Sequence, residues 1–274
     1  MRQLASGAGF ARYALGDVTV IALHDGYVDL PAGRLRKPDG QPFGPDLPEE
    51  VCLVNGRLRL SVNAFLIVNQ GRHILIDTGA SDAWEPTMGG LLASLDAAGV
   101  VREAIATVAL THTHEDHVHG LVAPGGADAF PRLERLLVPD AELARFDACE
   151  RLARFRARRE PFADGADIGP GVRAVAARGH EVGHSAFEVE SAGETLLVWG
   201  DIVHVPAVQF ARPDLSWELD ADQAEARAIR LVMLRRASRP GCHVAGAHLE
   251  FPGIGVVRDA GGRFVYTPLG EGAA

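Results

Sequence analysis

The run T-H-T-H-E-D-H-V-H-G at residues 111–120 constrains this chain more than any other stretch. It gathers four of the 11 histidines together with two carboxylates. The apolar residues 104–110 (A-I-A-T-V-A-L) just before it predict a short buried strand. Imidazole nitrogens and carboxylate oxygens are the ligands that Zn²⁺ and similar first-row metals select. The pattern therefore predicts a metal site on a loop at the C-terminal end of a strand.

The spacing inside this run allows one loop to serve two neighbouring metals. His112 and His114 are two residues apart, so they project to the same side of an extended backbone. A turn after them can carry Asp116 and His117 toward a second position close by. The alternative is a polar surface loop that happens to be rich in histidine. The spacing H-x-H-x-D-H directly after a buried strand favours the metal site.

Several other predicted strands are also followed by a histidine or an aspartate. Strands predicted at residues 73–76, 172–176, 195–199 and 243–247 lead, in that order, to Asp77, His180, Asp201 and His248. A metal site requires ligands that meet in this way at one edge of a sheet. The repeated order of strands and then a helix suits a core of two sheets flanked by helices.

Three helices and one long loop complete the coarse prediction. Apolar spacing predicts helices at residues 86–98 and 139–158, and an acidic start with a basic end predicts another at 220–239. Residues 31–50 hold several prolines and glycines, which predicts a loop. Loops of this length are often functional, so we expect a lid or a partner contact with Phe43 as its aromatic residue.

Composition and charge limit the classes of partner. Hydrophobic residues make up 47% and charged residues 23%, as in an ordinary globular protein. The formal net charge of −9 repels phosphate backbones, so we expect no nucleic-acid partner. The length of 274 residues suits one large α/β domain or two small ones.

The cysteines and the first residues bear on the compartment. Cys52, Cys149 and Cys242 are far apart and form no C-x-x-C pair, which argues against a disulfide framework. The first ten residues lack the continuous apolar segment of a signal peptide, and no stretch approaches the length of a membrane span. We therefore expect a cytoplasmic protein with no membrane partner.

The motifs described above resemble the metallo-β-lactamase superfamily. Two further segments, residues 200–210 (G-D-I-V-H-V-P-A-V-Q-F) and 247–255 (A-H-L-E-F-P-G-I-G), look like the methyl parathion hydrolase and lactonase subgroup of that superfamily. The resemblance extends over about residues 13–268. It implies an αββα sandwich of two mixed β-sheets flanked by helices, with metals at one edge. It also implies a single domain over residues 1–274.

The resemblance assigns roles to the candidate ligands. His112, His114 and His180 are expected at a first metal, Asp116, His117 and His248 at a second, and Asp201 as the bridge between them. In G-H-x-x-G-H the family uses the first histidine, so His184 is expected beside the ligands. Asp77 is expected to orient a ligating histidine and fix its tautomer. His119 stands where relatives often have glycine, and we expect it beside the ligands or without a role.

Two divalent ions, with Zn favoured over Mn, Fe or Co, imply hydrolysis by a hydroxide that bridges them. Asp116, Asp201 and His204 are the predicted catalytic residues. His204 stands three residues after Asp201, where related acyl-homoserine-lactone lactonases have a tyrosine that reaches the leaving oxygen. An imidazolium or a neutral imidazole N–H there could reach that oxygen in the same way, although His204 could instead only line the pocket.

The expected substrate is a small molecule: a lactone or aryl ester, with aryl phosphotriesters as a side reaction. The candidate pocket walls are aromatic, and each could equally belong to the core: Trp84, Phe210, Trp217 and Phe251. A β-lactamase or another hydrolase of the superfamily is an alternative. An iron-dependent oxidoreductase is less favoured, because such relatives carry a glutamate where this chain has His114, and also a flavin domain. Relatives are often dimers, which leaves a homodimer open.

Overall fold

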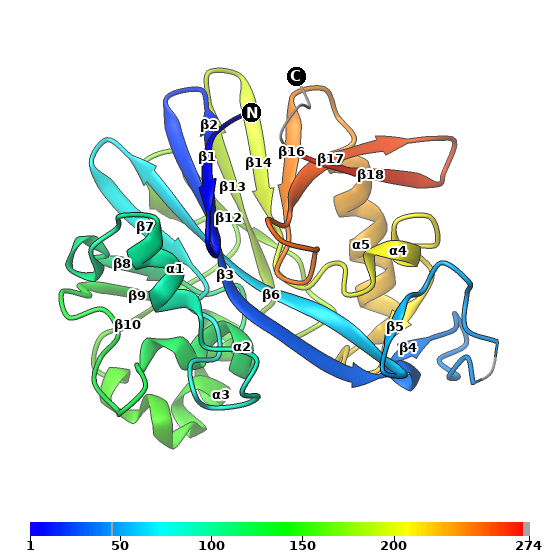
Figure 1. The fold of residues 1–274 in the computed structure, drawn as a ribbon, viewed down its shortest axis with the longest axis horizontal. Helices are drawn as coiled ribbons and strands as arrows, with labels where there is room; N and C mark the ends of the chain where they lie inside the picture. Colours follow the sequence, from blue (N-terminus) through cyan, green and yellow to red (C-terminus); the bar gives the residue numbers. More distant parts are fainter. Residues whose placement is uncertain (45, 271–274) are drawn as a thin grey trace.

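The computed structural model describes residues 1–44 and 46–270, so residue 45 of the predicted loop and the last four residues of the predicted domain lie outside it. Two mixed β-sheets pack against each other, and helices cover the outer face of each sheet (Figure 1). This is the αββα sandwich that the sequence predicts. The helices α1, α2 and α3 lie over one sheet and α5 over the other.

The first sheet has the strand order β1-β2-β3-β6-β7-β8-β9-β10, with β5 paired to the start of β6. Its strands are β1 (Arg2–Gly7), β2 (Phe10–Leu15), β3 (Val18–Pro31), β5 (Leu53–Val54), β6 (Arg57–Asn69), β7 (Arg72–Ile76), β8 (Thr107–Ala109), β9 (Arg135–Pro139) and β10 (Arg159–Phe162). Strands β7, β8 and β9 run parallel, so their C-terminal ends meet at one edge.

The second sheet has the order β11-β12-β13-β14-β16-β17-β18. Its strands are β11 (Asp167–Gly169), β12 (Val172–Ala176), β13 (Ser185–Ser191), β14 (Glu194–Val198), β16 (Cys242–Ala245), β17 (Ile254–Asp259) and β18 (Phe264–Pro268). Its parallel pair is β14 with β16. A separate two-stranded ribbon joins β4 (Leu35–Arg36) to β15 (Ser216–Trp217).

The helices are mostly short. The α-helices are α1 (Leu91–Ala97), α2 (Glu115–Val118), α3 (Leu143–Ala148), α4 (Pro206–Gln209) and α5 (Gln223–Ala237). The 3₁₀ turns are η1 (Ala32–Arg34), η2 (Arg102–Ala104), η3 (His119–Leu121), η4 (Asp140–Glu142) and η5 (Glu150–Phe155). In the part of the chain that the structure describes, none of them has the length and apolar character needed to span a membrane.

Two helix predictions need correction. Residues 139–158 do not form one long helix, because Pro139 ends β9 and the extended backbone at Cys149 separates α3 from η5. The helix predicted over 86–98 begins only at Leu91, since Gly89 just before it has a φ of +88°. The third helix prediction fits α5, where the Asp222 side chain accepts two backbone N–H bonds at the N-terminus.

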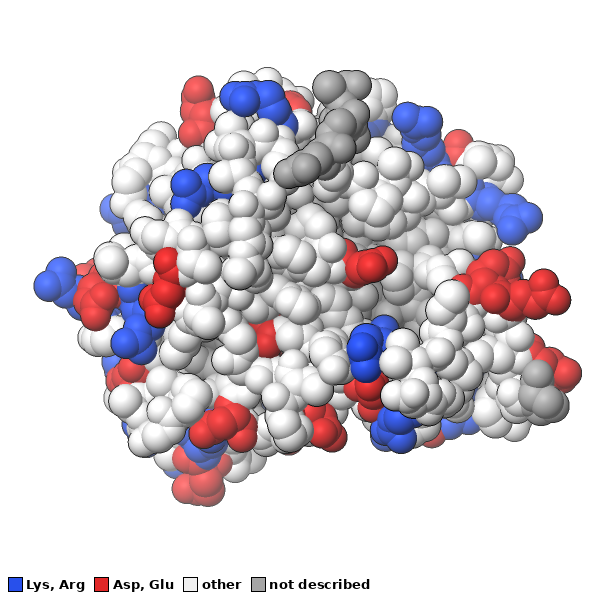
Figure 2. All heavy atoms as spheres, in the orientation of Figure 1, with Lys and Arg blue, Asp and Glu red and all other residues white. Residues whose placement is uncertain are grey.

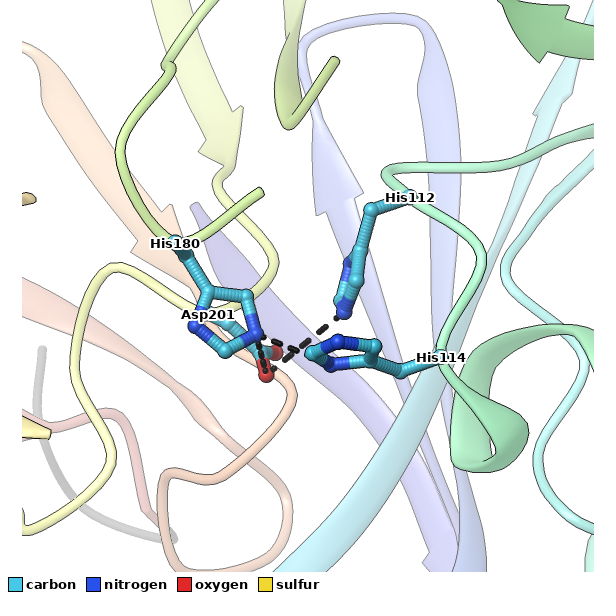
Figure 3. Close-up of side chains that lie close together, drawn as sticks. All are labelled: His112, His114, His180 and Asp201. Carbon is cyan, nitrogen blue, oxygen red and sulfur yellow. Dashed lines mark hydrogen bonds and ion pairs between the residues drawn. The ribbon is translucent and has the colours of Figure 1, made fainter. Parts of the chain in front are cut away.

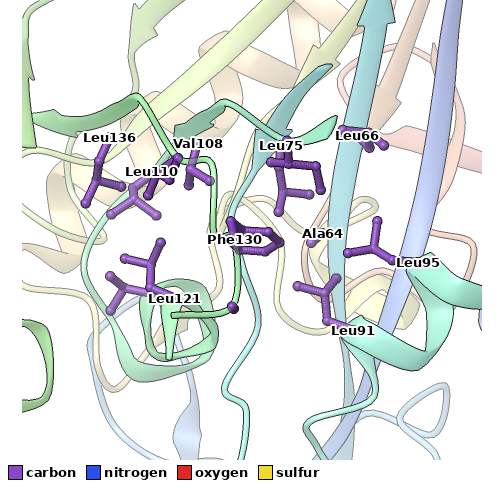
Figure 4. Close-up of a cluster of buried hydrophobic side chains, with 14 of the residues drawn as sticks. Ala64, Leu66, Leu75, Leu91, Leu95, Val108, Leu110, Leu121, Phe130 and Leu136 are labelled. Carbon is purple, nitrogen blue, oxygen red and sulfur yellow. The ribbon is translucent and has the colours of Figure 1, made fainter. Parts of the chain in front are cut away.

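The two long strands β3 and β6 separate two hydrophobic cores. Ile21 and Leu66 contribute to the core under α1, whereas Val20 and Ile67 face the second sheet. Figure 4 shows the core under α1, with Phe130 between residues of the sheet and residues of that helix. The alternation of apolar side chains along both strands therefore supports a helix layer on one face and a second sheet on the other.

Two further clusters complete the packing. On the second sheet, α5 packs Met233 and Leu234 against a cluster that includes Trp199. The far ends of β3 and β6 extend past the sandwich, as Figure 1 shows, and pack with β4 and β15. Phe43 of the predicted lid loop is buried in this last cluster together with Trp217. The described part of the loop therefore carries its aromatic side chain inward.

The face of the molecule in Figure 2 carries charges of both signs. Lysines and arginines are interspersed with aspartates and glutamates around its margin, and its middle is largely uncharged. A protein that binds nucleic acid usually gathers basic side chains into one patch or stripe. This face does not have that distribution.

Candidate metal centre

The topology brings the predicted site residues to one edge of the sandwich. Each follows the C-terminal end of a strand: Asp77 follows β7, the loop from Thr111 follows β8, His180 follows β12, Asp201 follows β14 and His248 follows β16. Because β7 and β8 are parallel, and β14 and β16 are parallel, these ends lie together. Ligand-type side chains from both sheets meet there.

One group of donor atoms comes from three histidines and an aspartate, as Figure 3 shows. The ligand atoms of His112, His114, His180 and Asp201 all lie within 4.8 Å of one another. His180 Nε2 lies 3.0 Å from His114 Nδ1 and 3.2 Å from Asp201 Oδ2. His112 Nε2 is 3.8 Å from the same Asp201 oxygen. The predicted first set of ligands is therefore assembled around one point.

A second group lies beside the first and faces the same aspartate. The ligand atoms of Asp116, His117 and His248 also lie within 4.8 Å of one another. His117 Nε2 is 3.2 Å from Asp201 Oδ1, and His248 Nε2 is 3.1 Å from Asp201 Oδ2. Asp201 thus contacts members of both groups, which is the position that the sequence predicts for a bridging ligand.

The polar atoms at this centre fit a divalent cation. His112 Nε2, His117 Nε2 and Asp201 Oδ1 are buried and have no hydrogen-bond partner among the described residues. Buried polar atoms in native proteins normally have partners, so a cluster of such unpaired atoms fits a bound cation. Imidazole nitrogens together with carboxylate oxygens suit zinc and other first-row metals.

In each candidate histidine, the ring nitrogen that points away from the centre (the far nitrogen) has a partner of its own. The pairs are His112 Nδ1 with Thr111 Oγ1 at 3.1 Å, His114 Nε2 with Glu181 at 2.6 Å, His117 Nδ1 with Asp77 at 2.8 Å, His180 Nδ1 with Asp220 at 2.9 Å and His248 Nδ1 with the Ser61 carbonyl at 2.8 Å. Carboxylate and carbonyl partners hold the proton on the far nitrogen, so a lone pair faces the centre.

Asp77 has an unusual backbone held by several bonds. Its φ is 60°, a left-handed conformation that is uncommon outside glycine. Its Oδ1 accepts the backbone N–H of Thr111, and its Oδ2 lies 2.8 Å from both Thr111 Oγ1 and His117 Nδ1. These bonds tie the end of β7 to the histidine loop after β8.

The side chain of His184 forms hydrogen bonds with the backbone and is not one of the candidate ligands. Its ring is fully buried, and its Nδ1 donates to the Ala177 carbonyl at 2.8 Å. Its Nε2 accepts the backbone N–H of Asp201 at 3.0 Å. Burial lowers the pKa of His184 to about 3, so the ring stays neutral. His184 therefore fixes the backbone of the aspartate that both donor groups share.

His204 is buried at the centre with neither ring nitrogen hydrogen-bonded inside the described chain. Its ring lies between Trp217 and His248, with ring centroids 4.7 Å and 5.2 Å away. Its Nε2 is 3.2 Å from Asp201 Oδ2. Burial lowers the pKa of His204 to about 4, so this imidazole is neutral near pH 7.

His119 lies away from the donor groups, and its Nε2 is 3.5 Å from Cys149 Sγ. The glycine that the loop requires is the next residue. A Cβ on Gly120 would lie 1.8 Å from the Thr78 carbonyl oxygen. Thr78 in turn donates its N–H and its hydroxyl to the His117 carbonyl, so this close approach helps to place a candidate ligand.

Charges at the centre shift the pKa values of its members strongly. Burial acts to raise the pKa of Asp201, but the surrounding histidines outweigh burial and hold it well below its usual range. Burial acts to lower the pKa of His117, yet the carboxylates of Asp201 and Asp116 hold it well above its ordinary value. The site therefore keeps Asp201 ionised, which favours a bound positive charge.

A pocket of about 350 Å³ opens onto the donor atoms. Its walls combine apolar side chains with site residues and one arginine: Val28, Leu30, Leu60, Trp84, Trp217, Leu219, His114, Glu115, Asp116, His180, Glu181, Asp201, His204, His248 and Arg145. Arg145 forms an ion pair with Glu181. A pocket that combines apolar walls with convergent polar groups suits a small organic ligand.

Two of the four aromatic residues predicted to line the pocket do not line it. Trp84 and Trp217 line the pocket, as expected. The prediction for Phe210 is wrong, because Phe210 stacks on Tyr266 at 4.8 Å in the core beneath α5. The prediction for Phe251 is also wrong, since Phe251 packs on the core between the sheets and lies 5.0 Å from the His24 ring.

Glu181 and Asp220 are site residues that sequence reasoning missed. Glu181 stands inside G-H-E-V-G-H, next to a predicted ligand, and this adjacency was a usable signal. Asp220 lies 40 residues from its partner His180, at the acidic start of a predicted helix. Nothing local in the sequence distinguishes such a residue from a helix cap.

The fold and the site together define a known class of protein. A family model described as the metallo-beta-lactamase superfamily matches residues 57–239. The match spans more than half of the chain, and the chain belongs to this superfamily. A comparison with curated proteins gives no significant match.

Solved structures of similar fold cover almost the whole chain. The hydrolase AbOPH of the beta lactamase superfamily has 29% sequence identity and a TM-score of 0.84, covering 97% of this chain and 99% of that one. AidC, a dizinc quorum-quenching lactonase solved with a product, has 21% identity and a TM-score of 0.84, covering 96% and 98%. A probable metal-dependent hydrolase from Staphylococcus aureus has 19% identity and a TM-score of 0.78, covering 96% and 100%.

Proposed function

We propose that this protein is a metal-dependent hydrolase that cleaves a small neutral ester or lactone, with aryl phosphotriesters as a side reaction. The observation that carries this proposal is that Asp201, a member of the first donor group, also contacts His117 and His248 of the second group beside a pocket with apolar walls. Two divalent ions, most simply Zn²⁺, would be held there. His112, His114 and His180 would hold the first and Asp116, His117 and His248 the second, with Asp201 between them.

When bound, two such cations lower the pKa of water and polarise the carbonyl or phosphoryl oxygen under attack. Asp116 lines the pocket, and its Oδ2 lies 3.6 Å from His248 Nε2. If one Asp116 oxygen holds the ion, the other can take up a proton at the pocket floor. Asp201 Oδ1 lies next to His117, whereas Asp201 Oδ2 lies next to His180 and His248. His184 keeps the backbone of Asp201 in place.

His204 is placed to assist the leaving group. Its neutral ring borders the pocket, and its nitrogens have no protein hydrogen bond within the described residues. One ring nitrogen carries a hydrogen, so the neutral ring can donate a hydrogen bond to the alkoxide or phenoxide oxygen as the bond to the substrate breaks. The stacked indole of Trp217 keeps the ring in one orientation.

The pocket and the similar proteins favour the substrate class. Leu30, Leu60 and Trp84 supply apolar wall to the pocket, which suits an acyl chain or an aryl ring. AidC is a lactonase and AbOPH a hydrolase, and both share the fold over nearly the full length. Three further points stay predictions. They are membership of the methyl parathion hydrolase and lactonase subgroup, a cytoplasmic location and a homodimer.

The test is metal content per chain on purified protein, with initial rates on a γ-lactone, an aryl ester and an aryl phosphotriester. Each rate is measured with and without chelator, and after Zn²⁺ is restored. Close to two metals per chain with chelator-sensitive hydrolysis supports the proposal, and the ranking of rates identifies the substrate class. Two metals with no hydrolysis of any substrate would contradict the substrate class. Absence of tightly held metal would contradict the proposal itself.

A further inference from the structure

A buried carboxylate behind the site joins a candidate ligand to the pocket wall. Asp220 lies between β15 and α5 and is almost fully buried. Its Oδ1 is 2.9 Å from His180 Nδ1, and its Oδ2 accepts the backbone N–H of Trp217 at 3.0 Å. The two oxygens therefore serve two different parts of the site.

The backbone around Asp220 also fixes the loop that carries His180. The N–H of Ala221 donates to the His180 carbonyl, and the N–H of Asp222 donates to the Gly179 carbonyl, each at 2.9 Å. A Cβ on Gly179 would lie 2.3 Å from the backbone nitrogen of Ala226, and its φ is +126°. The loop thus lies directly against the start of α5, which leaves little freedom between Asp220 and the imidazole.

The cationic side chain beside Asp220 is that of Arg230, and it donates its hydrogen bonds to backbone carbonyls. The guanidinium of Arg230 is buried and lies 3.9 Å from Asp220 Oδ2. Its Nε donates to the Ile202 carbonyl at 2.6 Å, and its Nη1 donates to the carbonyls of Pro213 and Leu215. The short hydrogen bonds of Asp220 go to His180 and Trp217, so these two residues determine what the carboxylate does.

We propose that Asp220 is a positioning residue that fixes the tautomer of His180 and the place of the Trp217 wall. An ionised carboxylate only accepts hydrogen bonds, so His180 must carry its proton on Nδ1. The Nε2 lone pair then faces His114 Nδ1 and Asp201 Oδ2, where a metal would bind. The same carboxylate holds the residue whose indole stacks on His204. This inference rests on the proposed metal site.

The variant that tests this is Asp220→Asn, which keeps the size and shape of the side chain. It has only one acceptor oxygen, whereas His180 Nδ1–H and the Trp217 N–H each need an acceptor. Its amide oxygen can accept from Trp217 or from His180, and its NH₂ group must face the other. We expect the affinity for Zn²⁺, measured by competition with a chelating dye, to fall about 10–100-fold. Asp222→Asn is the matched control, because it retains the helix cap and does not contact the His180 side chain.

A spectroscopic signature separates positioning from a general loss of structure. In the Zn²⁺-loaded wild type, nitrogen NMR should show His180 protonated on Nδ1, with that proton protected from exchange. In Asp220→Asn the signal should move or disappear, whereas in Asp222→Asn it should stay. A wild type that carries the proton on Nε2 would overturn the proposal, even if Asp220→Asn does not fold. Unchanged Zn²⁺ affinity in a folded Asp220→Asn would overturn it too.

The outcome is independent of the substrate. If the wild type binds Zn²⁺ but hydrolyses none of the three substrates, the proposed function fails. The affinity and the NMR signal still decide the role of Asp220. If the wild type hydrolyses a lactone and Asp220→Asn keeps both its affinity and its signal, the proposed function stands and the positioning role fails.

Discussion

The imidazole of His204 stacks on the indole of Trp217, with ring centroids 4.7 Å apart and ring planes 9° from parallel. The other face of the imidazole lies against His248, 5.2 Å away. Both ring nitrogens are buried without a hydrogen-bond partner in the described part of the protein. A histidine that served only to fill space would leave two polar atoms unsatisfied at a cost, so this arrangement favours a role toward the substrate.

The first prediction concerns the nitrogens of this ring. His204→Phe keeps an aromatic ring between Trp217 and His248 but removes the N–H hydrogen-bond donor. We expect turnover to fall about 10²-fold while metal content stays unchanged, since losing one hydrogen bond to a developing oxyanion costs about that much. The measurement is the rate on the best substrate together with metal per chain. His204→Ala should lose as much turnover, and unchanged turnover in both variants would exclude His204 from the mechanism.

The second prediction concerns Asp77, which contacts His117 and Thr111 through both of its oxygens. Asp77→Asn suits the left-handed backbone, because asparagine tolerates it well, but it cannot accept from every one of these donors. We expect the Zn²⁺ affinity to fall about 10–100-fold. Asp82→Asn is the control, since Asp82 is exposed and its side chain contacts Arg151 and the neighbouring Ser81, away from the candidate ligands. Equal losses in both variants would show that the effect is not specific to Asp77.

The sequence alone could predict the donor residues because their identities and local order carry the information. The motif around His112 and His114 follows a strand directly, and Asp201 and His248 also come just after strands. Parallel strands bring such positions to one edge without any further detail. The continuous apolar runs in β3 and β6 are buried on both faces, under α1 on one side and against the second sheet on the other.

Features that depend on distant contacts could not be predicted in the same way. Asp220 and Glu181 act across 40 and 67 residues, and neither has a local pattern that names its partner. Phe210 is apolar in the sequence whether it faces a pocket or a core, and only the packing beneath α5 decides. The failed helix over 139–158 has the same cause, because its apolar spacing fits one helix or two short ones.

The third prediction concerns pH and His184. The pKa of this buried ring is about 3 in the folded protein, against 6.5 for an ordinary histidine, so the unfolded chain binds more protons between these values. The contribution of His184 to stability is therefore complete above about pH 6.5 and is lost as the pH falls toward about 3. The slope for one group approaches about 1.4 kcal/mol per pH unit.

The measurement compares wild type with His184→Gln by denaturant unfolding of the metal-free proteins. Subtracting one from the other removes the titration of groups that both proteins share. We expect the advantage of the wild type to be largest at about pH 7 and to shrink steadily toward about pH 4. A difference that stays constant over this range would mean that the ring does not have to remain neutral.

The last prediction concerns the closest backbone approach at the site. A Cβ on Gly120 would lie 1.8 Å from the carbonyl oxygen of Thr78, and a backbone atom cannot move aside as a flexible side chain can. Gly120→Ala should therefore cost about 1–3 kcal/mol in unfolding free energy. It should also weaken Zn²⁺ binding, because Thr78 holds the carbonyl of His117 with two hydrogen bonds. Gly33→Ala is the control, since no atom lies within 4 Å of its added Cβ, and it should leave both quantities unchanged. If Gly120→Ala lost stability but kept full Zn²⁺ affinity, the contact would support the fold without placing His117.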